Sequence, residues 1–161
     1  MGVPIFTPAD IPVQGPEPRG PVLGLRLAVG DVSMEVNVVS MGNPHAVTFV
    51  MDAVSAYPLR EVGPVVQKHN AFPARVNFEV ARVLGRGEIE ARVWERGADE
   101  TLACGSGACA IAVVSHLLGY SDDVVRIHLP GGVLTVTWTG EENEVLLRGP
   151  VKQVFAGEWL E

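Results

Sequence analysis

The feature that most constrains this chain is an apolar helix preceded by a cysteine and two glycines. Residues 108–118 read ACAIAVVSHLL, which is alanine-rich, apolar on nearly every side and free of proline, as expected of a buried helix. The segment Cys-Gly-Ser-Gly at 104–107 should therefore lie at the N-terminus of that helix. Free backbone N–H groups and the helix dipole at this end favour a thiolate and can bind a carboxylate.

Two interpretations of Cys104 compete at this point. A cysteine in front of an apolar helix is commonly a small core residue. A reactive site is favoured by the polar residues just upstream, which an apolar packing site does not need. They are Glu95, Arg96, Asp99, Glu100 and Thr101. Taken alone, however, a Glu-Arg pair at a strand end is usually a solvated salt bridge of little energetic value.

The bulk composition excludes several classes of protein. The 161 residues fit one domain, and 47% apolar with 19% charged residues is typical of an ordered globular chain. A net charge of -7 without a basic cluster argues against nucleic acid as a partner. Because there is no membrane-length apolar run and prolines interrupt the first residues, we expect a cytoplasmic protein. The two cysteines give neither a disulfide framework nor a zinc spacing, so no metal site is expected.

Strand patterns flank the helix on both sides. Residues 58–69 carry apolar side chains at helical spacing and predict a second helix, although Gly-Pro at 63–64 interrupts it. β-branched and alternating segments predict eight or nine strands, at 22–29, 32–39, 46–51, 75–83, 88–94, 124–129, 133–139, 145–148 and 151–155. This pattern indicates an α+β fold, a largely antiparallel sheet curled around a central helix. Residues 1–21 hold six prolines and predict an extended connector or an arm along another surface.

The segment ERGADETLACGSGACA at 95–110 resembles the second cysteine motif of the diaminopimelate epimerase family, whose members are cofactor-independent amino-acid racemases and epimerases. Three further segments match the family in order and approximate spacing: MGVP at 1–4, MGNPHAV at 41–47 and RVNFE at 75–79. The resemblance covers essentially the whole chain but only about the second half of the family's protein. It implies a diaminopimelate-epimerase-like domain and a role in lysine and cell-wall biosynthesis.

The resemblance implies epimerisation of LL- to meso-diaminopimelate with no cofactor. Without pyridoxal phosphate, the developing carbanion must be stabilised by electrostatics, and inversion needs a base on one face and an acid on the other. A thiolate and a thiol can do this, and Cys104 would be one of the pair. Glu95 and His45 match family residues that tune the cysteine. For His45, a histidine simply packed at a strand start is the competing interpretation.

The resemblance also assigns substrate contacts. Backbone N–H groups of Gly105 and Ser106 would hold the α-carboxylate, although Ser106 also suits a plain helix cap. Arg96 would grip a carboxylate through its guanidinium fork, and Glu95 would accept from an ammonium group. The non-reacting end would be read by two amides, Asn43 and Asn77. Gly-Asn-Pro at 42–44 is also an ordinary turn, whereas an asparagine between Val76 and Phe78 is unfavourable in a strand.

The chain departs from the family at one position beside the motif. Asp99 stands where the family more often has glycine. A carboxylate pointing toward Cys104 would raise the thiol pKa, so we expect Asp99 to face solvent. His69, His116 and His128 receive no functional role, and Cys109 is expected to be a small core residue.

Only one cysteine motif is present in a chain whose family needs two. We therefore expect residues 22–150 to form the C-terminal catalytic half-domain, and residues 151–161 to hold the strand that in the family returns to the N-terminal domain. A missing N-terminal half or a partner chain would carry the second cysteine, and a homodimer is a further alternative. Two competing functions remain: a catalytically silent half that needs a partner, and a related enzyme such as a histidine racemase.

Overall fold

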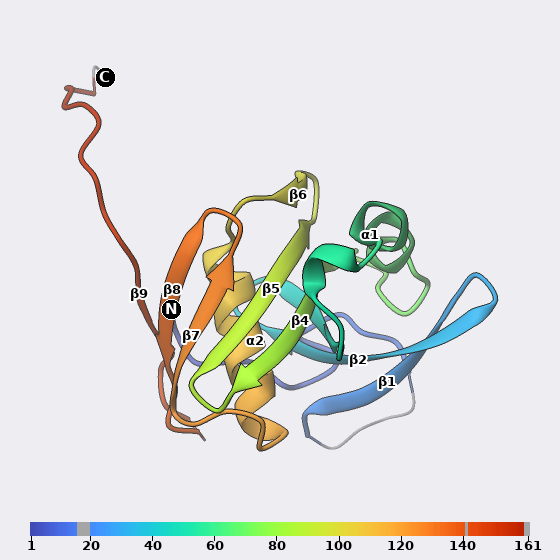
Figure 1. Ribbon diagram of the computed structural model, residues 1–161. Helices are drawn as coiled ribbons and strands as arrows, with labels where there is room; N and C mark the ends of the chain where they lie inside the picture. The colour runs from blue at the N-terminus through green and yellow to red at the C-terminus, as the bar shows by residue number, and fades with distance from the viewer. Residues whose placement is uncertain (16–19, 141, 160–161) are drawn as a thin grey trace.

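The computed structural model describes residues 1–15, 20–140 and 142–159 (Figure 1). The part of the predicted arm at 16–19 and the last two residues of the predicted final strand segment lie outside these ranges. In the described residues a nine-stranded sheet is accompanied by two α-helices and one short 3-10 helix. The strands are β1 Val22–Val29, β2 Val32–Ser40, β3 Pro44–Phe49, β4 Asn77–Gly85, β5 Glu88–Glu95, β6 Asp99–Thr101, β7 Val124–Leu129, β8 Gly132–Thr137 and β9 Leu146–Arg148. The helices are η1 Val54–Ala56, α1 Leu59–Gln67 and α2 Gly105–Leu117.

The sheet is mixed but mostly antiparallel, which confirms the predicted α+β class. Its order is β1-β2-β3-β4-β5-β7-β8-β9, and β6 pairs with β5 beyond this path. Two neighbouring pairs, β3 with β4 and β5 with β7, are parallel. The parallel pairing of β3 and β4 sets His45 opposite Asn77. Segments more than thirty residues apart in the sequence therefore meet at one end of the sheet.

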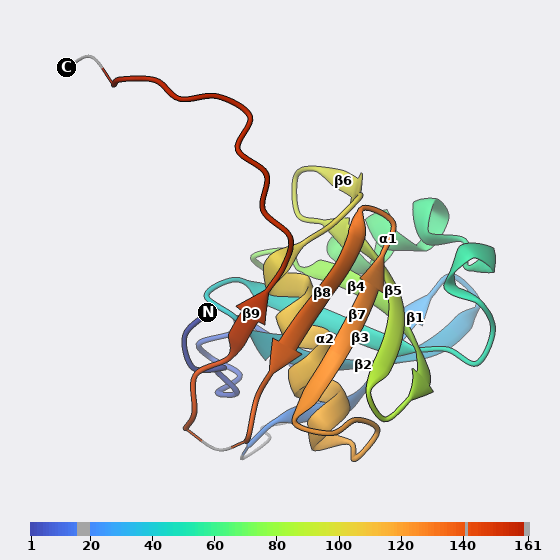
Figure 2. The same cartoon turned by 60° about the vertical axis from the view of Figure 1, so that its left-hand side comes forward.

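The central helix lies where its composition predicts. α2 contacts β2, β3, β4, β7 and β8, and Figures 1 and 2 both show it along the inner face of the curled sheet. Nine consecutive residues, 107–115, are buried, so the helix is enclosed on all sides. Its core partners on the strands include Val39, Val47, Ala81 and Val93. Strand alternation sends the residues next to these, such as Val38, Ala46 and Val80, to the opposite face, where α1 covers a second core.

The segment before β1 belongs to the same domain surface. Ile5 forms a bridge with Ser40, the Met1 ammonium group donates to the Val145 carbonyl at 2.8 Å, and Ile11 is completely buried. The described residues of the arm thus pack on the chain's own core.

One strand of the sheet is not predicted from the sequence. Residues 99–101, which none of the predicted strands covers, form β6 because the tight turn after β5 folds the chain back against Glu95. Residues 151–155, predicted as a strand that returns to an N-terminal half, have no strand partner within the described residues. Figure 1 shows this tail extending away from the domain. Neither α-helix in the described residues combines the length and apolar character that a membrane crossing requires.

The close contact between α1 and β5 gives a test of the outer core. A Cβ at Gly63 would lie 2.6 Å from the Trp94 ring, closer than two carbon atoms can pack. We expect Gly63→Ala to lower the free energy of unfolding by about 1–3 kcal/mol, as overpacking does. Urea unfolding measures this. Gly87→Ala is the matched control, because a Cβ there meets nothing within 4 Å, and it should change stability by less than about 0.5 kcal/mol. Equal losses in the two variants would contradict this packing.

Candidate functional site

Strand alternation gathers the polar residues on the face that carries α2. Asn77 and Glu79 share this face with Ala81 on β4, and Glu95 shares it with Val93 on β5. On β3, His45 lies two residues before Val47 and takes the same face. The apolar members of each strand pack against the body of α2, and the polar members lie at its N-terminal end. The sheet and the helix thereby place three strand ends around one cysteine.

Cys104 is the N-cap residue of α2, as its sequence position predicts. Its backbone is extended, with φ -135° and ψ 115°, and its side chain is 7% exposed. The Gly107 N–H donates to Sγ at 3.3 Å, and the Ser106 hydroxyl lies 3.5 Å from Sγ. Gly107 must be small, because a Cβ there would lie 3.3 Å from Sγ and 3.0 Å from Glu79 Oε1.

The surroundings of Cys104 favour the protonated thiol over the thiolate. Burial raises the pKa of Cys104, and the nearby Glu95 carboxylate adds to this. The hydrogen bonds from Ser106 and Gly107 lower the pKa, as the helix-end position predicts, but they do not outweigh burial. Cys104 therefore keeps its proton at neutral pH.

His45 reaches the cysteine through other side chains. It is completely buried, with Nδ1 2.6 Å from Glu79 Oε1 and Nε2 3.0 Å from Asn43 Oδ1. Asn43 Nδ2 in turn donates to Ser106 Oγ at 3.4 Å. Among the described residues there is no direct hydrogen bond between His45 and Cys104. Asn43 thus links His45 to Ser106, whose hydroxyl lies beside the thiol.

Asn77 joins two of the sequence motifs. Its Nδ2 donates to the Pro44 carbonyl at 3.0 Å, and its Oδ1 accepts from the Arg96 N–H at 2.8 Å. The Arg96 side chain is exposed and donates to the Ala74 carbonyl at 3.0 Å. Asn77 thus holds the 42–45 turn against the turn that follows β5, and the guanidinium of Arg96 stays at the surface.

The acidic residues upstream of Cys104 separate into two groups. Glu95 accepts a hydrogen bond from the Thr101 hydroxyl and faces the cysteine. Glu100 instead lies between Arg92 and Arg60, at 2.7 and 3.0 Å. Asp99 is exposed, as predicted, and has φ 59°, the left-handed region where glycine is unstrained.

The structure adds Glu79 to the residues singled out from the sequence. This carboxyl group is completely buried and bonds His45 directly. The sequence carries a signal for it, since a glutamate between Phe78 and Val80 in a strand that is apolar on both faces needs a buried partner. Cys109 is also completely buried, which raises its pKa to about 12, in accord with a core residue.

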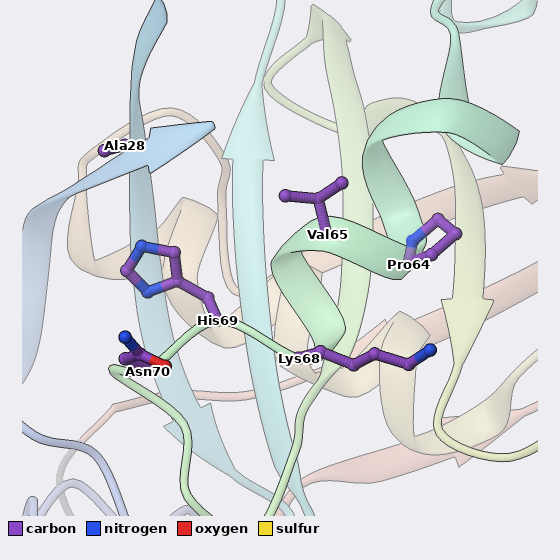
Figure 3. Close-up of a pocket in the computed structure, with 6 residues that line it drawn as sticks. All are labelled: Ala28, Pro64, Val65, Lys68, His69 and Asn70. Carbon is purple, nitrogen blue, oxygen red and sulfur yellow. The ribbon is translucent and has the colours of Figure 1, made fainter. Parts of the chain in front are cut away.

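A hollow elsewhere on the surface is separate from this cluster. Figure 3 shows its lining at the end of α1 and beside β1, which consists of Ala28, Pro64, Val65, Lys68, His69 and Asn70. None of these residues belongs to the cluster around Cys104. Within the described ranges, no three histidine, cysteine, aspartate or glutamate side chains are grouped as a metal site requires.

The raised pKa of Cys104 predicts how the alkylation rate of the thiol depends on pH. Only the thiolate is alkylated, so iodoacetamide at pH 7 should modify Cys104 at least about threefold more slowly than a cysteine in a short unfolded peptide. The rate should still rise beyond pH 9. Mass spectrometry measures the rate. The Cys104→Ser variant shows how much alkylation comes from Cys109, the other cysteine. A rate that levels off below pH 8 would contradict the prediction.

The exposed position of Asp99 predicts that its carboxylate has little influence on the thiol. Asp99→Gly should change the alkylation rate of Cys104 by less than about twofold. The free energy of unfolding should change by less than about 1 kcal/mol, because relief at φ 59° offsets the entropy of an added glycine. Alkylation kinetics and urea unfolding check both parts. A severalfold faster alkylation would show that Asp99 acts on Cys104.

Comparisons with known proteins agree on one family. The family model for diaminopimelate epimerase matches residues 37–154. The diaminopimelate epimerase of Desulforudis audaxviator is 47% identical over 160 residues, which cover 99% of this chain and 56% of that protein. That of Heliobacterium modesticaldum is 48% identical over 158 residues, covering 98% and 55%. The chain thus spans about half the length of the curated relatives it matches.

A solved structure shows the same fold at lower identity. The hydroxyproline epimerase from Agrobacterium vitis, with bound trans-4-OH-L-proline, superposes with a TM-score of 0.55 at 18% identity. The match covers 75% of this chain and 43% of that one, and it supports the fold alone. The family model matches more than half of the chain, and the curated relatives are nearly half identical over almost all of it. This chain belongs to the diaminopimelate epimerase family.

Proposed function

We propose that this chain forms one catalytic half of a diaminopimelate epimerase and provides one of two cysteines that exchange the α-proton of the substrate. The observation that carries the proposal is the position of Cys104 at the N-terminus of a buried helix, in a chain closely related to diaminopimelate epimerases. The reaction would convert LL- to meso-diaminopimelate without pyridoxal phosphate.

The first turn of α2 offers a site for the α-carboxylate. The N–H groups of Gly107 and Ala108 are occupied by Cys104, through Sγ and the carbonyl oxygen. The N–H groups of Gly105 and Ser106 have no hydrogen-bond partner among the described residues, and both residues are half-buried. A carboxylate bound to these two groups is stabilised by the helix dipole, and its α-carbon lies beside Sγ.

Cys104 is suited to the acid role when the site is at rest. A buried thiol that holds its proton can donate it to one face of the α-carbon as a thiolate on the opposite face removes the original proton. In the reverse direction the two sulfur atoms exchange roles. Backbone donors at the helix end would offset negative charge as it develops on the substrate carboxylate.

The remaining polar residues would bind the rest of the substrate. Glu95 faces the cysteine and can accept from the α-ammonium group. Arg96 has its guanidinium at the surface, available to a carboxylate from the entering substrate. Asn43 and Asn77 would read the far amino-acid head through their side-chain amides. His45 would act on the site through Asn43.

A second half must supply the other cysteine. The chain's other cysteine, Cys109, is enclosed in the core and cannot face the substrate. The tail beyond β9 carries strongly exposed apolar side chains, including Val151, Phe155 and Trp159 at 97%, 85% and 94%. We infer that this tail pairs with the cysteine-bearing partner half, as the final strand does in the family.

Solvent deuterium incorporation tests the proposal. LL- and meso-diaminopimelate are incubated in D2O with this chain, alone and mixed with the N-terminal half of the Desulforudis audaxviator relative. We expect α-deuterium and epimerisation in the mixture, and at least about a hundredfold loss with Cys104→Ser, because a serine hydroxyl is far less acidic than a thiol.

The core cysteine provides the control for this experiment. Cys109→Ala should exchange like the wild-type mixture, provided that it remains folded by circular dichroism. Exchange that survives Cys104→Ser would overturn the assigned role. A folded mixture that forms a complex but incorporates no deuterium would favour a catalytically silent half.

A further inference from the structure

A buried carboxyl group, Glu79, lies behind the proposed site without touching the substrate position. It comes from β4, is completely buried, and lies 2.6 Å from His45 Nδ1. Its Oε1 would also be 3.0 Å from a Cβ at Gly107, so it packs directly under the first turn of α2. The hydrogen bonds between it and Cys104 run through His45, Asn43 and Ser106.

Asn43 fixes the first part of this orientation. Its Oδ1 accepts from His45 Nε2 at 3.0 Å, and its Nδ2 donates to Ser106 Oγ at 3.4 Å. His45 therefore carries a proton on Nε2. One further proton lies in the bond between Nδ1 and Glu79 Oε1, either on the ring as an imidazolium or on the carboxyl oxygen.

The second oxygen of Glu79 decides between these two forms. Glu79 Oε2 is buried and has no hydrogen-bond partner among the described residues. An ionised carboxylate would leave a charged oxygen buried and unpaired, whereas a neutral carboxyl group leaves only a carbonyl oxygen there. Burial, reinforced by the nearby Glu95 carboxyl group, also raises the pKa of Glu79, although His45 opposes this.

We propose that Glu79 is a positioning residue that keeps its proton and donates it to His45 Nδ1, so that His45, Asn43 and Ser106 are oriented with the Ser106 hydroxyl donating to Cys104 Sγ. His45 donates to Asn43, Asn43 donates to Ser106, and Ser106 is left with its own proton for the sulfur. The Ser106 hydrogen bond would stabilise the thiolate when Cys104 loses its proton. Only this role in catalysis rests on the proposed function. No proton is transferred along this chain.

The charged and titratable groups around Glu79 come from three elements. They are His45 on β3, Glu95 on β5 and Cys104 at the start of α2.

Nitrogen NMR of the wild-type chain tests the proton positions without any variant. Long-range proton–nitrogen spectra distinguish protonated from unprotonated ring nitrogens. We expect His45 to show Nε2 protonated and Nδ1 unprotonated at pH 7. Two protonated nitrogens, or protonation at Nδ1 alone, would overturn the proposal.

Three single variants and one double variant test the effect on the sulfur. Glu79→Gln keeps a donor to Nδ1 but cannot ionise, so Cys104 alkylation at pH 8 should stay within about twofold of wild type. Glu79→Met removes the donor, and alkylation should slow about threefold because the orientation of the chain is no longer fixed. Ser106→Ala should slow it by a similar or larger factor. The double variant Glu79→Met with Ser106→Ala should be no slower than Ser106→Ala alone, since both act through one hydroxyl.

The outcomes separate this inference from the proposed function. Severalfold faster Cys104 alkylation in Glu79→Gln would mean that wild-type Glu79 is an anion. If the double variant is slowed by the product of the two single factors, Glu79 and Ser106 act on the sulfur independently. Either result overturns the inference. Both measurements use the chain without substrate, so a failure of deuterium incorporation leaves them untouched. If Glu79→Met does not fold, the wild-type spectra and Glu79→Gln still decide.

Discussion

Burial of α2 on the inner face of the sheet is the interaction on which the rest of the structure depends. Nine consecutive residues of this helix are enclosed, and strands from both halves of the chain contribute side chains to the same core. A helix that is apolar all round has no rotational preference of its own, so its orientation is fixed by packing and by its capped end. That end is Cys104, with Gly107 in a place where a Cβ would lie only 3.3 Å from the sulfur. The fold thus presents one thiol at one fixed point.

The polar residues around the thiol follow from the same sheet. Every second side chain of β3, β4 and β5 faces α2. Apolar side chains at these positions pack on the body of the helix, and polar ones lie at its N-terminal end: His45, Asn77, Glu79 and Glu95. These residues are bonded mainly to one another and to backbone, so the site is preorganised before any ligand binds. Preorganised donors cost no reorganisation during a reaction, which matters most where no cofactor delocalises charge. The same enclosure keeps Cys104 protonated at rest.

The sequence predicts much of this arrangement. Composition and periodicity predict α2, most strands and the position of Cys104 at the helix end, because these depend on local pattern. Glu79 was not singled out, since its role depends on the parallel pairing of β3 with β4, which brings it to His45. The sequence does not indicate β6, because its three polar residues show no alternation of apolar and polar side chains. This strand forms only through its pairing with β5. The tail at 151–155 has strand-like residues, yet a strand needs a neighbour, which the described part of the chain does not provide.

The proposed function depends on the open end of α2 binding the substrate carboxylate beside Cys104. Amide proton–nitrogen spectra recorded during titration with meso-diaminopimelate test this most directly, with 1,5-diaminopentane as a matched compound that lacks both carboxylates. The account predicts that the largest shifts fall on Gly105 and Ser106, and that the diamine causes none there. Shifts of equal size with the diamine, or shifts confined to residues remote from the helix end, would contradict it.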